Sequence, residues 1–228
     1  MTVPAIRERM VASLRNVSEE LAAAVASGLG LDPMPKAMPR ALKSVPAPEV
    51  RISPALSLTA LPGTVGIRTR KVAILVADGV EAEPLRNLAA ELTRQGAIVR
   101  LLGARLGGFT AADGTRVEVD GTFENHPSVL FDGAVLPDGP AACAALALDG
   151  RVAEFIKDQF RHGKTVLALG AAAVLLEGLG IPATLPTGGR DPGVVIVDPR
   201  EEALFAKAFI KALANHRHPQ RETDPPRV

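Results

Sequence analysis

Residues 71–102 read KVAILVADGVEAEPLRNLAAELTRQGAIVRLL. Residues 71–77 are apolar over a length that suits a buried strand, residues 84–95 carry apolar side chains at helical spacing, and residues 97–102 are again strand-like. A strand, a helix and a second strand joined by short loops are typical of a parallel sheet covered by helices. This stretch therefore predicts an α/β fold.

The same alternation continues toward the C-terminus. Asp113 and Gly114 predict the turn of a hairpin between Phe109 and Val119. Further strands are predicted at residues 133–136, 164–170 and 193–198, and helical stretches at residues 141–162, 171–177 and 201–215. Residues 70–216 are thus expected to form a three-layer α/β/α sandwich with a mainly parallel sheet, and the polar, proline-rich residues 217–228 a disordered tail.

Residues 1–31 predict a helical segment that precedes the sandwich. Asn16 and Ser18 suggest a break between two short helices, with Ser18 as the N-cap of the second, and Gly28 and Gly30 predict its end. The resulting apolar stripe is expected to face a partner. It consists of residues that recur at spacings of three and four: Ile6, Met10, Leu14, Val17, Leu21 and Val25.

Residues 32–69 predict a proline-rich linker or wrapping arm. Seven prolines lie between Asp32 and Pro62 and keep this segment extended. Its apolar residues are too numerous for a solvated linker, so we expect it to lie along a surface, including that of another subunit. These residues are Leu42, Val45, Val50, Ile52, Leu56, Leu58 and Leu61.

The composition argues against several classes of partner. A formal net charge of +1 over 228 residues gives no field that would attract nucleic acid or an anionic membrane, and only 3% of the residues are aromatic. The single cysteine forms no intrachain disulfide, no apolar run is long enough to span a bilayer, and the N-terminal stretch lacks a continuous apolar signal region. These features predict a cytoplasmic protein without nucleic-acid or membrane partners.

Ligands of open α/β sheets bind beyond the carboxyl ends of the strands, where this chain offers few reactive groups. Cys143 stands among small apolar residues with no adjacent cation, which predicts a plain buried thiol. Asp138, Asp191 and Asp198 lie near strand or loop ends, where aspartate most often serves as a turn or capping residue. No metal site is predicted.

Histidines and glycine pairs favour structural roles. Residues 216–218, His-Arg-His, close the last predicted helix, where cations offset its C-terminal dipole, and they lack a third metal ligand. His126 and His162 are expected at the surface. The pairs at residues 139–140 and 188–189 predict ordinary turns, and no GxGxxG motif follows the first strand, which argues against a dinucleotide site.

The segments LVADGVEAEPL (residues 75–85) and KTVLALGAAAVLLEGLG (residues 164–180) resemble the DJ-1/PfpI group of the glutamine-amidotransferase-like superfamily. The resemblance implies a flavodoxin-like fold. Active members place a cysteine on a tight turn between strand and helix, often followed by histidine, with a glutamate nearby. The matching turn positions here hold Gly170 and Ala171, and the acid position falls near Glu81, Glu83 and Pro84. The catalytic positions are therefore predicted to be vestigial.

A wider set of segments resembles the end of a large-subunit haem catalase. These are IRERMVASLRNVSEELAAAVASGLGL at residues 6–31, a proline-rich arm with MPK at 34–36, RKVAILVADGV at 70–80, PSVLFDGAVLPDG at 127–139 and HRHP at 216–219. In that family a haem-containing core is followed by a helical domain, a long connection and a flavodoxin-like domain. The resemblance covers nearly the whole chain.

The catalase resemblance implies a module without the peroxide-decomposing chemistry of its parent family. The distal histidine and asparagine and the proximal tyrosine of the catalase core would lie upstream, and this chain has no Tyr to ligate haem. We expect a non-catalytic domain without cofactor that supports subunit stability and assembly, self-associates through residues 1–62 or packs on the catalase core. The alternatives are a holdase that binds unfolded proteins and, less favoured, a DJ-1-like hydrolase or glyoxalase.

Overall fold

The computed structural model describes residues 2–42, 44, 46–51, 53–57, 66–198, 202–223, 225, 226 and 228. The chain divides into two compact units, Met1–Ser53 and Pro54–Val228. The arm residues Val45, Ile52, Leu58 and Leu61 and the expected helix start at Glu201 lie outside the described residues. Among the described helices, none combines the length and the apolar composition needed to cross a membrane.

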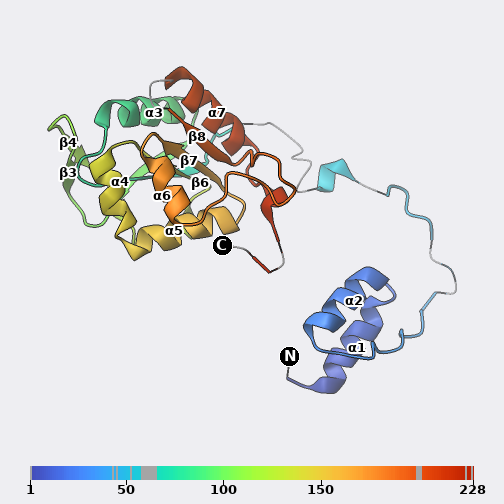
Figure 1. The fold of residues 1–228 in the computed structure, drawn as a ribbon. Helices are drawn as coiled ribbons and strands as arrows, with labels where there is room; N and C mark the ends of the chain where they lie inside the picture. Colours follow the sequence, from blue (N-terminus) through green and yellow to red (C-terminus); the bar gives the residue numbers. More distant parts are fainter. Residues whose placement is uncertain are drawn as a thin grey trace. The chain divides into compact units, whose positions relative to one another are not determined.

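The larger unit is built on a six-stranded parallel sheet with the strand order β5-β2-β1-β6-β7-β8. Helices α3 and α7 cover one face and α4, α5 and α6 cover the other (Figure 1). The predicted three-layer α/β/α sandwich is therefore confirmed. The strands are β1 (Lys71–Leu75), β2 (Ile98–Gly103), β5 (Gly121–Thr122), β6 (Gly133–Leu136), β7 (Thr165–Leu169) and β8 (Val194–Val197). The helices are α3 (Ala82–Arg94), α4 (Pro140–Ala147), α5 (Gly150–Arg161), α6 (Ala172–Gly178) and α7 (Glu202–Ala214).

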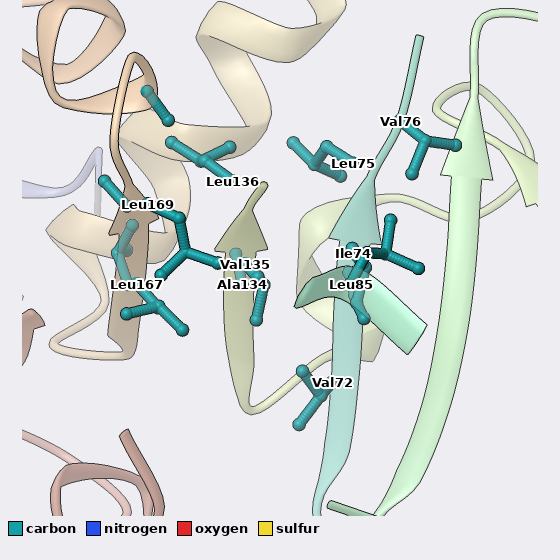
Figure 2. Close-up of a cluster of buried hydrophobic side chains, with 14 of the residues drawn as sticks. Val72, Ile74, Leu75, Val76, Leu85, Ala134, Val135, Leu136, Leu167 and Leu169 are labelled. Carbon is teal, nitrogen blue, oxygen red and sulfur yellow. The ribbon is translucent and has the colours of Figure 1, made fainter. Parts of the chain in front are cut away.

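The core lies on both faces of the three central strands. Every residue of β6 and β7 is buried, as is every residue of β1 after Lys71. Figure 2 shows the side chains of these strands together with Leu85 of α3. Burial on both faces explains why these strands read as continuous apolar runs rather than as alternating patterns.

Two local features refine the predicted elements. A small antiparallel hairpin, β3 (Gly108–Thr110) and β4 (Arg116–Glu118), follows β2, and its turn contains Asp113 and Gly114 as predicted. The stretch expected to be helical from 141 to 162 forms two helices rather than one. The first ends at Ala147 with Leu148 as its C-cap, and Asp149 caps the second, since its carboxylate accepts a hydrogen bond from the Arg151 N–H at 3.0 Å.

The smaller unit is a helical hairpin closed by the first part of the arm. Helices α1 (Pro4–Leu14) and α2 (Glu19–Gly28) pack against each other, and Ser18 caps α2 as predicted. The arm returns across α1, where the Met38 N–H donates to the Ala12 carbonyl at 3.0 Å and Arg15 donates to the Pro35 carbonyl at 2.9 Å. These hydrogen bonds fix the start of the arm on the hairpin.

The segment after α7 is folded against the sheet, which corrects the expectation of a disordered tail for residues 217–223. Arg221 and Asp191 form a buried ion pair, with Nε to Oδ2 at 2.8 Å and Nη2 to Oδ1 at 2.9 Å. The Arg221 Nη1 also donates to the carbonyls of Phe160 and Lys164. The polar composition does not predict this folded segment, because Arg221 binds groups that are distant in the chain: the Asp191 carboxylate and the carbonyls at the end of α5 and the start of β7. Arg221 is the last residue of a short 3-10 helix, η3 (Pro219–Arg221).

Candidate functional site

The turn between β7 and α6 has the geometry that a nucleophile would require. Gly170 follows β7 directly and has a φ of +51°, a left-handed conformation that strains any residue with a side chain. Ala171 precedes the first residue of α6. Position 170 is therefore a tight strand-to-helix turn, as expected, and it carries no reactive side chain.

The carboxylate of Asp138 fills the space that a side chain at position 170 would occupy. A Cβ built on Gly170 would lie 2.4 Å from Asp138 Oδ2 and 2.5 Å from Oδ1. The same Oδ1 accepts hydrogen bonds from the N–H groups of Ala171 and Gly139, both at 2.8 Å. Asp138 ties the carboxyl ends of β6 and β7 together and occupies the backbone donors that could otherwise stabilise an anion.

The glutamates near the predicted acid position do not complete a catalytic pair. The Glu81 N–H donates to the Asp138 carbonyl at 2.9 Å, so the backbone before α3 is hydrogen-bonded to the residue that connects β6 and β7. Glu81 and Pro84 are half-buried and Glu83 is exposed. Within the described part of the chain, no hydrogen bond reaches the side chain of Glu81 or Glu83. Proximity to the turn is thus present, but position 170 supplies no thiol to pair with these carboxylates.

Cys143 lies on α4 as a buried thiol, 7% exposed, with its Sγ 3.7 Å from the Pro137 carbonyl oxygen. Burial raises the pKa of the Cys143 thiol to about 11, and the charge of Asp138 adds to this effect. The thiol also lines an apolar groove of about 480 Å³ between α4 and α6. It remains protonated at neutral pH and is a poor nucleophile.

Native Cys143 is expected to react with a disulfide reagent at least about a hundredfold more slowly than the same thiol in the urea-unfolded chain. The reason is that a pKa of about 11, in place of 9.0, lowers the thiolate fraction by about two powers of ten. Colour development from an aromatic disulfide at about neutral pH measures both rates, and the unfolded chain serves as the control. Comparable native and unfolded rates would contradict the assignment of a protonated thiol.

The remaining residues singled out from the sequence lie apart from this turn. His162 is exposed and His126 is half-buried beside Asn125, whose Oδ1 lies 2.7 Å from His126 Nδ1. Asp191 belongs to the ion pair with Arg221, and Asp198 follows β8. In the described residues, no three histidine, cysteine, aspartate or glutamate side chains gather in an arrangement that could hold a metal ion.

The two glycine pairs serve as turns. Gly139 has a φ of +128°, and a Cβ there would lie 2.3 Å from the Gly79 carbonyl oxygen, so the residue allows close backbone approach. Gly188, with a φ of +89°, lies in a tight loop in which its N–H donates to the Leu185 carbonyl. Gly139 and Pro140 do open α4, but the Pro140 nitrogen has no hydrogen to donate to a phosphate. This start therefore differs from that of a dinucleotide-binding loop.

His218 departs from its expected role as an exposed helix cap. It is buried, and its Nε2 lies 3.1 Å from the Thr165 hydroxyl. Burial, followed by the charge of Arg221, lowers the pKa of His218, while Asp191 opposes the shift. The charge pattern could not reveal this, because the packing of His218 depends on the close approach of Gly193, where a Cβ would lie 2.2 Å from the imidazole.

Acidification is expected to destabilise the chain through His218. Its folded pKa is lowered, so its contribution to stability is complete above the unfolded pKa of about 6.5 and is lost as the pH falls below that value. Urea unfolding at about pH 7.5 and about pH 5.5 should therefore show a larger loss for the native chain than for His218→Gln. Equal losses in the two proteins would contradict the role of His218, and His162→Gln serves as the exposed control.

The residues present do not fit haem. Catalase-type ligation needs a tyrosinate, and this chain has no Tyr. The only cysteine is a protonated, buried thiol, and the one histidine that is buried packs against Thr165 and Gly193 within the described core.

Comparison with known proteins identifies relatives for nearly all of the chain. Residues 68–223 match the model of the C-terminal domain found in long catalases. Catalase HPII of Pseudomonas putida is 38% identical over 209 residues, which are 92% of this chain and 27% of that protein. Catalase HPII of Mycobacterium avium is 35% identical over 229 residues, which are 97% of this chain and 31% of that protein. The chain spans less than a third of the length of these relatives.

Solved structures extend the comparison to the fold. DJ-1beta of Drosophila melanogaster superposes with a TM-score of 0.57 at 20% identity, over 64% of this chain and 91% of that one. A two-domain protein of Anabaena variabilis with DJ-1/ThiJ/PfpI-like and ferritin-like domains gives a TM-score of 0.57 at 21% identity, over 63% and 50% of the two chains. These likenesses confirm the DJ-1/PfpI-like, flavodoxin-like arrangement of the larger unit.

Proposed function

The chain belongs to the family of C-terminal domains found in long catalases, and from that premise we propose that it is a non-catalytic module that stabilises and assembles catalase subunits. Asp138 occupies the turn at Gly170, and Cys143 is protonated. These two features argue against retained DJ-1-like hydrolase or glyoxalase chemistry. Peroxide decomposition would belong to the part of the parent protein that this chain does not match.

The observation that carries the proposal is the apolar surface of the helical hairpin. Large apolar side chains at the start of α1 and along it are each between 44% and 50% exposed: Val3, the N-cap, followed by Ile6 and Met10. Leu21 of α2 is 45% exposed. The buried core of this unit is small, consisting of Val11, Ala22 and Ala26 with partly buried neighbours. A unit that exposes more large apolar side chains than it buries is a candidate for packing against another surface.

The match to long catalases supports the catalase core as this surface. The alignment with the Mycobacterium avium protein covers 97% of this chain, so it includes most of the hairpin, although the family model begins only at residue 68. The relatives contain more than twice this length again beyond the matched part. We infer that the hairpin packs on the catalase core within a subunit or an oligomer. Without that core, it is expected to drive self-association in a cytoplasmic setting.

The native mass of the purified chain tests this role of the hairpin. The intact chain should form a dimer or a larger species, and Ile6→Ser/Met10→Ser should shift it toward monomer, because two exposed apolar contacts are lost. Leu148→Ser/Val174→Ser is the matched control, since it removes apolar side chains that are 89% and 69% exposed on the other unit. A monomeric native chain, or an equal shift in the control, would refute the proposal. The same sample should show no Soret band and consume no peroxide.

The same exposed surface supports a second candidate, a holdase that binds unfolded proteins. Apolar side chains that lack a partner in the described hairpin are suited to capture apolar segments of other chains. The purified chain should then suppress the heat aggregation of a client enzyme, and Ile6→Ser/Met10→Ser should suppress it less. Client aggregation that is unaffected by the intact chain would leave assembly as the better-supported function.

A further inference from the structure

A cationic pocket lies near the starts of β7 and β8, where the end of α5 meets the segment after α7. Its volume is about 470 Å³, and the charged or titratable side chains that line it are Arg161, His162, His216, Arg217, His218 and Glu222. Arginines at positions 161 and 217 are permanently charged, and Glu222 is the single acid among them. The pocket is thus net positive at neutral pH, and more so when its histidines are protonated.

The backbone brings the two sides of this pocket together. His216 has a φ of +65°, an uncommon left-handed conformation for a residue with a side chain, and this turns the chain back under the sheet after α7. The His218 N–H then donates to the Gly163 carbonyl at 2.7 Å, which joins the segment to the end of α5. Arg221 and Asp191 lock the same segment in place. The pocket walls are therefore held by buried contacts.

The arginines retain donors that these contacts do not use. Arg217 Nη1 donates to the His216 carbonyl at 2.9 Å and lies 3.9 Å from Asp132, but in the described residues its Nε and Nη2 have no hydrogen-bond acceptor. Arg161 Nε donates to the Val228 carbonyl and Nη1 lies 3.5 Å from Asp158, while Nη2 has no acceptor among the same residues. A guanidinium with two unused donors is suited to a tetrahedral oxyanion.

The charges around the pocket are not balanced. Asp132 is the common neighbour of Arg70, His216 and Arg217, at distances of 3.9, 3.4 and 3.9 Å. Burial and then Arg217 and Arg70 lower the pKa of His216, and burial and then Arg217 lower the pKa of Lys164 to about 8. The neighbouring cations Arg70, Arg161, Arg217 and Lys164 outnumber the neighbouring carboxylates Asp132, Asp158 and Glu222, so a bound anion would reduce the repulsion among the cations.

We propose that this cationic pocket binds a small molecule that carries a phosphate group, with the unused donors of Arg217 and Arg161 on the phosphate oxygens. The volume exceeds that of inorganic phosphate and falls in the range of small-molecule sites, so it leaves room for an organic part. His216 adds positive charge as the pH falls. This inference does not depend on the assembly role of the hairpin, which lies in the other unit.

Sulfate is the probe that tests the pocket, because its charge stays constant where the histidines titrate. Backbone amide shifts of the full chain are followed by NMR as sulfate replaces chloride at constant ionic strength. We expect saturable shifts at Gly163 and Arg217, and an affinity that rises severalfold between about pH 7.5 and about pH 5.5, because the lowered pKa of His216 delays its gain of charge. Inorganic phosphate at the higher pH should shift the same amides. Shifts that do not saturate, or an affinity independent of pH, would overturn the assignment.

Arg217→Gln is expected to weaken sulfate binding about tenfold, the usual effect of losing a charged hydrogen bond. Arg100→Gln is the matched control, since Arg100 forms an equally long ion pair, 3.8 Å from Asp120, on the distant strand β2. Arg161→Gln should weaken binding in the same direction and covers the case in which Arg217→Gln fails to fold. Equal affinities in all variants and the native chain would overturn the proposal.

Vesicles distinguish a small phosphate compound from a lipid headgroup. The chain is sedimented with phosphatidylcholine vesicles that contain phosphatidic acid. It is expected to remain in the supernatant even when the concentration of lipid phosphate equals the inorganic phosphate concentration that saturates the pocket. Co-sedimentation that Arg217→Gln abolishes would overturn the assignment to a small molecule.

Discussion

Replacing Arg221 with Leu is expected to lower the free energy of unfolding by about 3–5 kcal/mol. Arg221 and Asp191 are 2% and 0% exposed in their side chains, so removal of the cation leaves a buried carboxylate without its partner. The change also removes the donors to the Phe160 and Lys164 carbonyls and the contact of the guanidinium with the Phe160 ring, 4.5 Å away. Urea unfolding must be followed by far-UV circular dichroism, because the chain has neither Trp nor Tyr.

Two further variants identify the buried charge as the cause. Asp191→Asn/Arg221→Met removes both charges and keeps an oxygen for the Gly193 N–H, so it should regain a large part of the loss. Arg116→Leu, which breaks an exposed pair with Glu118, should cost less than about 1 kcal/mol. A cost for Arg221→Leu no larger than that of Arg116→Leu would show that the ion pair does not stabilise the C-terminal segment.

Gly170→Ala is expected to cost about 2–5 kcal/mol, which is more than its backbone conformation alone explains. A left-handed φ costs a residue with a side chain about 1–2 kcal/mol, and overlap of the new Cβ with Asp138 adds about 1–3 kcal/mol. Gly180→Ala isolates the first contribution, since Gly180 has a φ of +72° with no atom within 4 Å of its Cβ position. Urea unfolding of the two variants measures the difference.

A double-mutant cycle tests the role of Asp138 directly. Asp138→Ala alone should be destabilising by about 1–3 kcal/mol, because the Ala171 and Gly139 N–H groups lose their acceptor. Combined with Gly170→Ala it should cost less than the sum, because the overlap is gone. Additive costs, or equal costs for Gly170→Ala and Gly180→Ala, would mean that the carboxylate does not occupy the turn.

The sequence predicted the layers of the fold well because they depend on local patterns. The strand at residues 71–77 and the helix after it carry periodicities that tertiary packing reinforces, and Ser18 caps α2 through a contact three residues away. The absence of a reactive side chain at Gly170 is also predictable, since a single residue type decides it. These features require little knowledge of distant parts of the chain.

Contacts between distant residues explain what sequence patterns missed. The sequence pattern predicts a turn role for Asp138, because nothing in it shows that the carboxylate reaches Ala171, 33 positions later. Arg221 looked like part of a solvated tail, although its partner Asp191 lies 30 positions earlier. The cationic pocket joins Arg161 to Arg217, which are separated in the chain by β7, α6, β8 and α7. In each case the decisive partner follows from the topology of the sheet rather than from spacing along the chain.

The tie at Asp138 also bears on how readily such a domain could acquire a nucleophile at this turn. A mutation that places a cysteine at position 170 first meets the carboxylate, and one that removes Asp138 first leaves two backbone donors without an acceptor. Both single steps pass through a less stable protein, and most domains tolerate the loss of only a few kcal/mol. Selection acting one substitution at a time therefore meets a barrier on either route, so a nucleophile at this turn is hard to acquire.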